Sequence, residues 1–423
     1  MSVFSIFSEK GNQKAKKKIT AQEYYLRLAR AVTAFKYGLI LLLVVFVAFC
    51  VTFKSDEITL DNFKYIGKVI DVNSQITPSN GDVLYFDADD TNRFGLVRGD
   101  LAVANSNGVS VYMLSGSRLL KSNFKFDCPV VLQSEKNAFV YDLGGTELKI
   151  FSSYANVETQ SYSYPILGAA VNEKGTFAVI SSERGYRSAL FVYDEHFRPV
   201  YRQFFGEVYL TAADINEEGT ELVTAAVKSV NGENATVVNC FSVNEEKALY
   251  ELTVAGEFPW KVSYSADGGF SLLTDKALRI YNSDKECICT VSFEGKTVSD
   301  CKLSEEFAIL SFSPSSLSGS KELAVYSTEN GQELYRTLYS KGLKNFEVLG
   351  DRVYALSASE LSVFSPKEAD EGFKKEVDEV YSSVLPVNES YALVLSGGSA
   401  EVVYITNAVE SSQSDGSTES KEE

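Results

Sequence analysis

The chain has 423 residues and carries 57 acidic against 40 basic side chains, a formal net charge of −17. Its single histidine excludes zinc sites built on several histidines, and its acidic balance opposes binding to the phosphates of nucleic acids. Hydrophobic residues make up 45% of the chain, which is ordinary for a folded protein with a sizeable core.

The N-terminal part is basic and ends in a predicted helix. Residues 1–19 are rich in Lys, Ser and Gln and predict a disordered, basic, cytoplasmic segment. Thr20 and Glu23 form a T-x-x-E capping box, and apolar residues recur behind it at helical spacing. Residues 20–36 therefore predict an amphipathic juxtamembrane helix.

An uncharged apolar span follows over residues 37–53, from Tyr37 to Phe53, between Lys36 and Lys54. Its length is at the short end of what crosses a bilayer, so we predict one transmembrane helix. Residues 1–36 carry a net charge of +6, which leaves −23 for the rest. Because basic segments stay on the cytoplasmic side, we expect a cytoplasmic N-terminus and an extracytoplasmic bulk.

Cleavage of this span as a signal peptide is the alternative to a permanent anchor. No small-x-small cleavage site follows it. A lipoprotein-type site at Cys50 is disfavoured, because Phe49 stands where a small residue is needed. We therefore prefer an uncleaved signal-anchor in the cell membrane.

Residues 54–81 read as a connector, and a repeat begins after them. A short β-patterned run closed by an aromatic residue occurs eight times, and its seven intervals span 292 residues, about 42 each. The closing aromatics are Tyr112, Phe151, Tyr193, Phe241, Tyr281, Tyr326, Phe364 and a degenerate copy at Tyr404. Four-stranded units at this period are typical of β-propeller blades. We predict an all-β, eight-bladed propeller over residues 82–406, or seven blades if Tyr404 is a chance match.

The ends of the predicted ring show how it closes. The last repeat has three strands before the chain turns into residues 407–423, a Ser-rich acidic tail that predicts disorder. Its missing fourth strand is predicted at Val83–Asp87, ahead of the first blade. Such closure removes an exposed sheet edge.

Spacing within the repeats indicates where a partner would bind. Three predicted loops between second and third strands are long: 181–188, 228–236 and 313–321. They raise a rim over blades 3, 4 and 6, on the face that also carries the links between blades.

Candidate binding residues on this rim are of the types that dominate interfaces. They are Arg184, Tyr186 and Arg187 in the first long loop, and Phe258 and Trp260 in the link into blade 5. The alternative is that Phe258 and Trp260 pack between blades and that Arg187 is a solvated loop charge.

Catalytic and cofactor motifs are missing from the sequence. His196 is the sole histidine, and no G-x-S-x-G elbow, calcium loop or phosphate-binding glycine motif occurs. We therefore expect no metal, no cofactor and no enzyme activity. Two alternatives stay open: a glycan- or peptide-processing enzyme of the envelope with an Asp/Glu pair in the propeller funnel, and an envelope sensor with a cytoplasmic partner.

The basic N-terminus, the single anchor and strands such as Leu190-Phe-Val-Tyr193 resemble an uncharacterised, membrane-anchored propeller family of clostridial-type Gram-positive bacteria. That resemblance spans nearly the whole chain and implies no catalytic residues. The propeller is also similar to WD40 and quinoprotein propellers. Quinoprotein dehydrogenases carry a Trp motif in every blade, whereas Trp260 is the only tryptophan here, which argues against a quinone cofactor. Catalytically inert assembly scaffolds of the same shape are an analogy.

From these patterns we expect a single-pass membrane protein whose propeller acts as a non-catalytic scaffold. The expected partner is another envelope protein or a wall polymer, bound at the long-loop face. The sequence leaves the oligomeric state open.

Overall fold

The computed structural model describes residues 21–53 and 79–405, apart from 231, 246, 294, 314–318 and 369–371. The predictions for the N-terminus, for most of the connector and for the tail lie outside these residues. The chain divides into two units, residues 1–70 and 71–423.

The first unit contains one long helix, α1 (Ala21–Phe53). It runs without a break through the predicted boundary between residues 36 and 37 and continues past Gly38; no Pro occurs in it. Residues 28–46 are long and apolar enough to cross a membrane, by length and composition. A signal sequence near the N-terminus meets the same test, so the helix fits either role.

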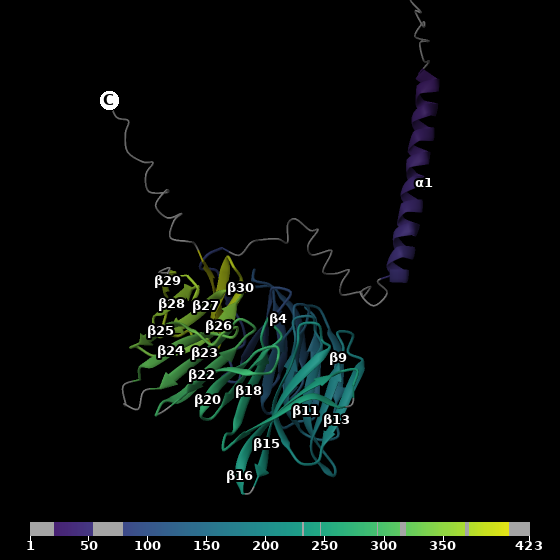
Figure 1. Ribbon diagram of the computed structural model, residues 1–423. Coiled ribbons are helices and arrows are strands. Elements are labelled where there is room, and N and C mark those ends of the chain that lie inside the picture. The colour runs from purple at the N-terminus through teal and green to yellow at the C-terminus, as the bar shows by residue number, and fades with distance from the viewer. Residues whose placement is uncertain are drawn as a thin grey trace, which may run out of the picture. The chain divides into compact units, whose positions relative to one another are not determined.

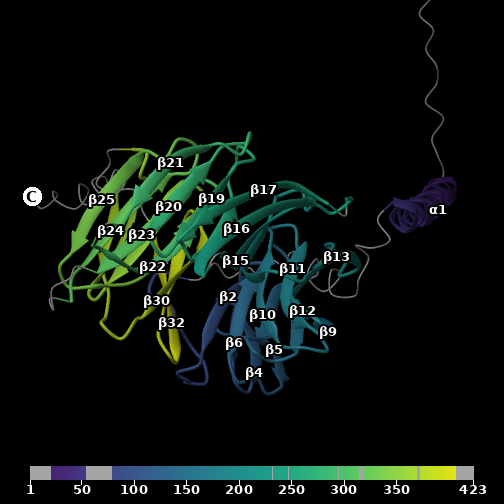
Figure 2. The same cartoon turned by 60° about the horizontal axis from the view of Figure 1, so that its bottom comes forward.

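The second unit is an eight-bladed β-propeller, in which each blade is an antiparallel sheet of four strands. The blades follow the chain around the ring, and the yellow strands of the last blade lie beside the blue strands of the first (Figures 1 and 2). First strands of neighbouring blades contact one another, so they line the axis.

The first four blades contain these strands. Blade 1 has β2 (Arg93–Val97), β3 (Asp100–Asn105), β4 (Gly108–Tyr112) and β5 (Arg118–Asn123). Blade 2 has β6 (Pro129–Gln133), β7 (Ala138–Asp142), β8 (Glu147–Phe151) and β9 (Asn156–Ser161). Blade 3 has β10 (Ile166–Val171), β11 (Phe177–Glu183), β12 (Tyr186–Tyr193) and β13 (Pro199–Phe205). Blade 4 has β14 (Tyr209–Ile215), β15 (Glu221–Val230), β16 (Glu233–Ser242) and β17 (Ala248–Ala255).

The remaining four blades repeat this order. Blade 5 has β18 (Pro259–Tyr264), β19 (Phe270–Thr274), β20 (Ala277–Tyr281) and β21 (Cys287–Ser292). Blade 6 has β22 (Thr297–Leu303), β23 (Phe307–Ser313), β24 (Lys321–Ser327) and β25 (Glu333–Tyr339). Blade 7 has β26 (Leu343–Leu349), β27 (Arg352–Ser357), β28 (Glu360–Phe364) and β29 (Phe373–Glu376). Blade 8 has β30 (Ser383–Asn388), β31 (Tyr391–Leu395), β32 (Ser399–Tyr404) and β1 (Val83–Tyr85).

Blade 8 confirms the predicted closure and the count of eight. β1 pairs antiparallel with β32, where Leu84 lies opposite Ala400. Leu84 is buried in the core between the last and first blades. Tyr404 belongs to β32, which excludes the seven-bladed alternative.

The repeated aromatic residue has a structural reason. In blades 1–6 it is the last or second-last residue of the third strand and lies opposite a β-bulge in the fourth strand. In blades 3 and 5 it also stacks on the phenylalanine that begins the second strand: Phe177 and Tyr193 have ring centroids 4.6 Å apart, and Phe270 and Tyr281 4.5 Å. The aromatic therefore fills the core at the position where the outer strand bends.

The propeller has two faces with different roles. We call the face with the second-to-third-strand turns and the links between blades the hairpin face, and the opposite one the entry face. The chain enters and leaves on the entry face, because Tyr404 donates its backbone NH to the Asn80 side chain and Ile405 donates to the carbonyl of Ser390 in a first-to-second-strand turn. The hairpin face is thus free of both ends of the folded chain.

Candidate binding surfaces on the hairpin face

Two of the three predicted long loops are ordered hairpins, so the prediction of loops was wrong there. The β11–β12 ladder continues to Glu183 opposite Tyr186, and the β15–β16 ladder to Val230 opposite Glu233. Both end in a turn with glycine at positive φ, 83° at Gly185 and 87° at Gly232. The extra residues satisfy one another's backbone groups and extend the sheet beyond the blade. Figure 1 shows the tip of β15–β16 projecting past its neighbours. The third loop, 313–321, includes residues outside the description.

The blade 3 hairpin brings its predicted residues together with the first strand of blade 4. The Tyr186 ring stacks on Phe204 with centroids 5.0 Å apart. The Arg187 guanidinium lies 4.9 Å from the Tyr209 ring centroid and donates a hydrogen bond to the Tyr209 hydroxyl. Arg184 is exposed in the turn. Arg187 is therefore held over an aromatic face while it remains exposed.

Phe258 and Trp260 lie at the start of blade 5 and remain 38% and 41% exposed. They are thus not enclosed between the blades. Trp260 occupies a β-bulge between Pro259 and Lys261 in the β18–β19 ladder. Blade 4 separates these two residues from the blade 3 hairpin.

The link that carries them is held by a network centred on Glu257. Its carboxylate accepts hydrogen bonds from Arg279 (2.5 and 3.3 Å) and from Thr274 (2.8 Å), and its backbone carbonyl accepts one from Thr236 (2.9 Å). Burial raises the pKa of Glu257, but the hydrogen bonds from Arg279 and Thr274 outweigh this and hold its pKa below the ordinary range.

Asp275 fixes the next residue of the same link from both sides. Its carboxylate accepts from the backbone NH of Phe258 at 2.7 Å, and its own NH donates to the Phe258 carbonyl at 2.9 Å. The backbone of the link is therefore held at Glu257 and at Phe258, two residues before Trp260.

Exposed large apolar residues are distributed unequally over the propeller. Among the described propeller residues, every exposed large apolar side chain outside the outer strands lies on the hairpin face. None of these side chains lies in the turns of the entry face. They are Leu143, Leu167, Tyr186, Tyr209, Val230, Phe258, Trp260 and Val380. We call Tyr186, Tyr209, Phe258 and Trp260, over blades 3 to 5, the aromatic patch. Tyr209, which is 49% exposed, was not predicted, although it starts its blade much as Trp260 does.

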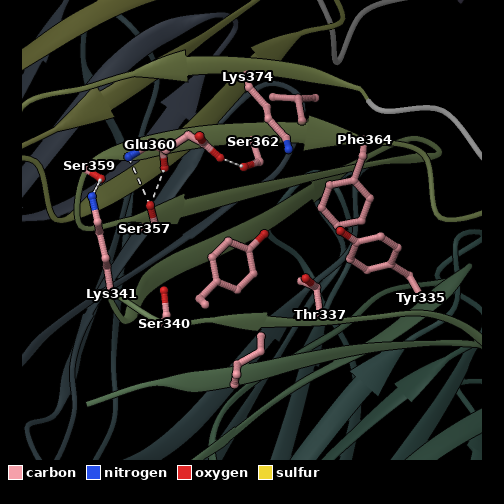
Figure 3. A pocket seen from close by; sticks show the side chains of 13 residues that line it. Tyr335, Thr337, Ser340, Lys341, Ser357, Ser359, Glu360, Ser362, Phe364 and Lys374 are labelled. Carbon is pink, nitrogen blue, oxygen red and sulfur yellow. Dashed lines mark hydrogen bonds between the residues drawn. The ribbon is translucent and has the colours of Figure 1, made fainter. Parts of the chain in front are cut away.

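A polar groove of about 470 Å³ lies between blades 6 and 7 (Figure 3). Tyr335 and Phe364 pack at one end, with ring centroids 4.2 Å apart. The remainder is lined mainly by hydroxyl-bearing side chains, by the apolar Leu338 and Val363, and by three charged residues, Lys341, Glu360 and Lys374. The sequence did not predict this groove.

Acidic side chains on the axial strands bear on the enzyme alternative. Asp214 accepts hydrogen bonds from Ser263 and from the backbone NH of Tyr264, and Glu347 is paired with Lys302. Asp300 on β22 is exposed. No group of three or more His, Cys, Asp or Glu side chains that would hold a metal ion occurs among the described residues.

Comparison with known proteins gives the family and the fold. Residues 84–404 match the family of unknown function DUF5711. The chain belongs to this family. No curated protein matches it.

Solved structures similar to this DUF5711 chain are propellers at low sequence identity. Sqt1 of Saccharomyces cerevisiae superposes with a TM-score of 0.56 and 12% identity, covering 78% of this chain and 100% of Sqt1. BamB from Moraxella catarrhalis gives 0.52 and 12%, covering 77% and 98%. The C-terminal WD40 domain of Sif2 gives 0.51 and 11%, covering 77% and 99%. At such identities the likeness establishes the fold alone.

Proposed function

We propose that this chain is a membrane-anchored, non-catalytic scaffold that binds a partner through the aromatic patch on its hairpin face. The anchor is α1, with residues 37–53 in the bilayer, the N-terminus in the cytoplasm and the propeller outside. The partner is another envelope protein or a wall polymer. The observation that carries this proposal is the confinement of exposed aromatic residues, away from outer strands, to one face.

Rigidity of the patch supports a binding role. Binding is weakened by the entropy of ordering an interface, and residues that are already fixed avoid that cost. The Glu257 network and the Asp275 carboxylate hold the backbone that carries Phe258 and leads to Trp260, and ring contacts hold Tyr186 and Arg187. Aromatic and Arg side chains in fixed positions are the groups that contribute most at interfaces.

We propose a non-catalytic role because of the hydrogen bonds and ion pairs that the acidic side chains on the axial strands form. Two of the three named above, Asp214 and Glu347, are satisfied by protein donors, which does not suit a pair of carboxylates poised to act on a glycan. A scaffold needs only shape and fixed contacts.

Site-specific photo-cross-linking in living cells tests the scaffold. A photoreactive phenylalanine analogue replaces Tyr186 or Trp260 in the full chain, and Ile288 or Leu338 in control chains. Ile288 is exposed on an outer strand to the same 41% as Trp260, and Leu338 to 63%. One recurrent adduct from both patch positions, absent from both controls, supports the proposal. No adduct, or the same adducts from all four positions, overturns it.

A further inference from the structure

The groove between blades 6 and 7 has a closed counterpart between blades 5 and 6. There, Glu322 pairs with Lys296 at 3.0 Å and with Arg336. Burial raises the pKa of Glu322, but the hydrogen bonds from Arg336 and Lys296 outweigh it and lower the pKa. This cluster is satisfied within the protein.

The same positions of the next blade carry the same kinds of charge. Glu322 and Glu360 each stand one residue before the leucine that begins the repeated motif, Leu323-Ala-Val-Tyr326 in blade 6 and Leu361-Ser-Val-Phe364 in blade 7. Arg336 lies opposite Ala324 in the β24–β25 ladder, as Lys374 lies opposite Ser362 in the β28–β29 ladder. Lys296 and Lys341 both lie in the links that enter the respective blades.

In the groove these charges are not joined to one another. The Glu360 carboxylate accepts the Ser362 hydroxyl at 2.9 Å, and Lys341 reaches the Ser359 hydroxyl at 3.5 Å. Among the described residues, neither Glu360 nor Lys374 forms an ion pair. Figure 3 shows Lys341, Glu360 and Lys374 around the same hollow.

The pairing of β28 with β29 favours a cation near Glu360. Glu376 stands directly opposite Glu360 in β29, and like charges at opposed positions destabilise a strand pair. A cationic group placed beside Glu360 relieves that repulsion. The two lysines offer ammonium groups to an anion at the same time.

We propose that this groove binds a small zwitterion of the α-amino acid class. Its ammonium group takes Glu360, its carboxylate takes Lys341 and Lys374, and the groove's hydroxyls orient it. A volume of about 470 Å³ is within the range of small-molecule sites. The proposal does not depend on the aromatic patch or its partner.

Calorimetric titration of the purified full-length chain in detergent micelles tests this site. The probes are glycine, alanine, glutamate and lysine, with acetate, methylammonium and inorganic phosphate as ligands that offer only one kind of charge. The variants are Glu360→Gln and Lys341→Gln/Lys374→Gln, and Lys296→Gln is the matched control because it breaks the closed cluster of blade 6 instead. Circular dichroism confirms that each variant is folded.

Saturable binding of at least one amino acid is expected, with each groove variant weakening it about tenfold or more, since each removes a charge-assisted contact. Lys296→Gln leaves the affinity unchanged. Three outcomes overturn the proposal. No amino acid binds at millimolar concentration, the groove variants leave the affinity for amino acids unchanged, or inorganic phosphate binds the Glu360→Gln chain as tightly as an amino acid binds the parent. The last outcome identifies a plain anion site.

Discussion

The ion pair between Glu257 and Arg279 allows a quantitative test of how the aromatic patch is held. Glu257 is 8% exposed, whereas the Arg279 side chain retains 23% of its surface. Removing one member of a buried pair costs about 3–5 kcal/mol, because the other charge is left without compensation. Since water reaches part of Arg279, we expect Arg279→Met to cost roughly 2–4 kcal/mol.

The reverse change, Glu257→Leu, is expected to cost less. Arg279 would keep the Thr290 hydroxyl at 3.3 Å and its exposed surface. Thr274 would still donate to the carbonyl of Ala277 at 3.0 Å. The free energy of unfolding then falls only by the contribution of hydrogen bonds to a charged group, about 1.5–3 kcal/mol.

The double variant E257L/R279M separates the pair from its parts. Replacing a buried ion pair by apolar side chains is often close to neutral, so we expect its stability within about 1 kcal/mol of the parent. The single costs therefore exceed the double cost, and the cycle gives a coupling of roughly 2 kcal/mol or more.

Tryptophan fluorescence provides the assay, because Trp260 is the only tryptophan and lies three residues from Glu257. Urea unfolding of the parent, both single variants and the double variant gives the four midpoints. If the two single costs simply add in the double variant, the pair does not hold the link, and the explanation for the fixed patch is refuted.

Three further predictions concern pH, the core and the closure. Burial raises the pKa of Glu257, but the hydrogen bonds from Arg279 and Thr274 outweigh burial and lower the pKa. The ionised carboxylate therefore stabilises the fold above the ordinary carboxyl range, and this stabilisation is lost as the pH falls below about 4. The urea midpoint should then fall less steeply with decreasing pH in E257Q than in the parent. Phe270→Ala should cost about 3–5 kcal/mol in the same titration, because Phe270 is fully buried and stacked on Tyr281; a cost below 1 kcal/mol would contradict this packing. Leu84→Asp should release the closing strand and make it sensitive to protease, whereas Tyr85→Asp, at a position 76% exposed in the same strand, should leave it protected; equal sensitivity of both would count against closure by β1.

The fold was predictable because each blade repeats the same physical requirement. An aromatic closes each third strand, in blades 1–6 where the outer strand bends, and this repetition imposes a visible period on the sequence. The closing strand was predictable because the last repeat lacked a fourth strand. In the structure Leu84 of that strand is buried between the last and the first blade.

The hairpins of blades 3 and 4 were predicted as long loops because of their length. Length alone does not distinguish an irregular loop from a strand pair that extends beyond its blade. Arg184-Gly185 and Asn231-Gly232 are two-residue turn sequences flanked by β-forming residues, which is a hairpin signal. Tyr209 was not predicted, although it begins the first strand of blade 4 as Trp260 stands near the start of the first strand of blade 5.

The groove shows a limit of a different kind. Glu322 and Glu360 occupy the same repeat position, and both have lysine or arginine residues at comparable spacing, so their sequences predict the same ion pairs. The outcome depends on whether the neighbouring outer strand brings its cation within reach. Arg336 reaches Glu322, whereas Lys374 at the equivalent ladder position lines the groove and forms no ion pair with Glu360. The same pattern of charges therefore forms a structural ion pair in one blade and surrounds a hollow without ion pairs in the next, and such charges are what a ligand of complementary charge can satisfy.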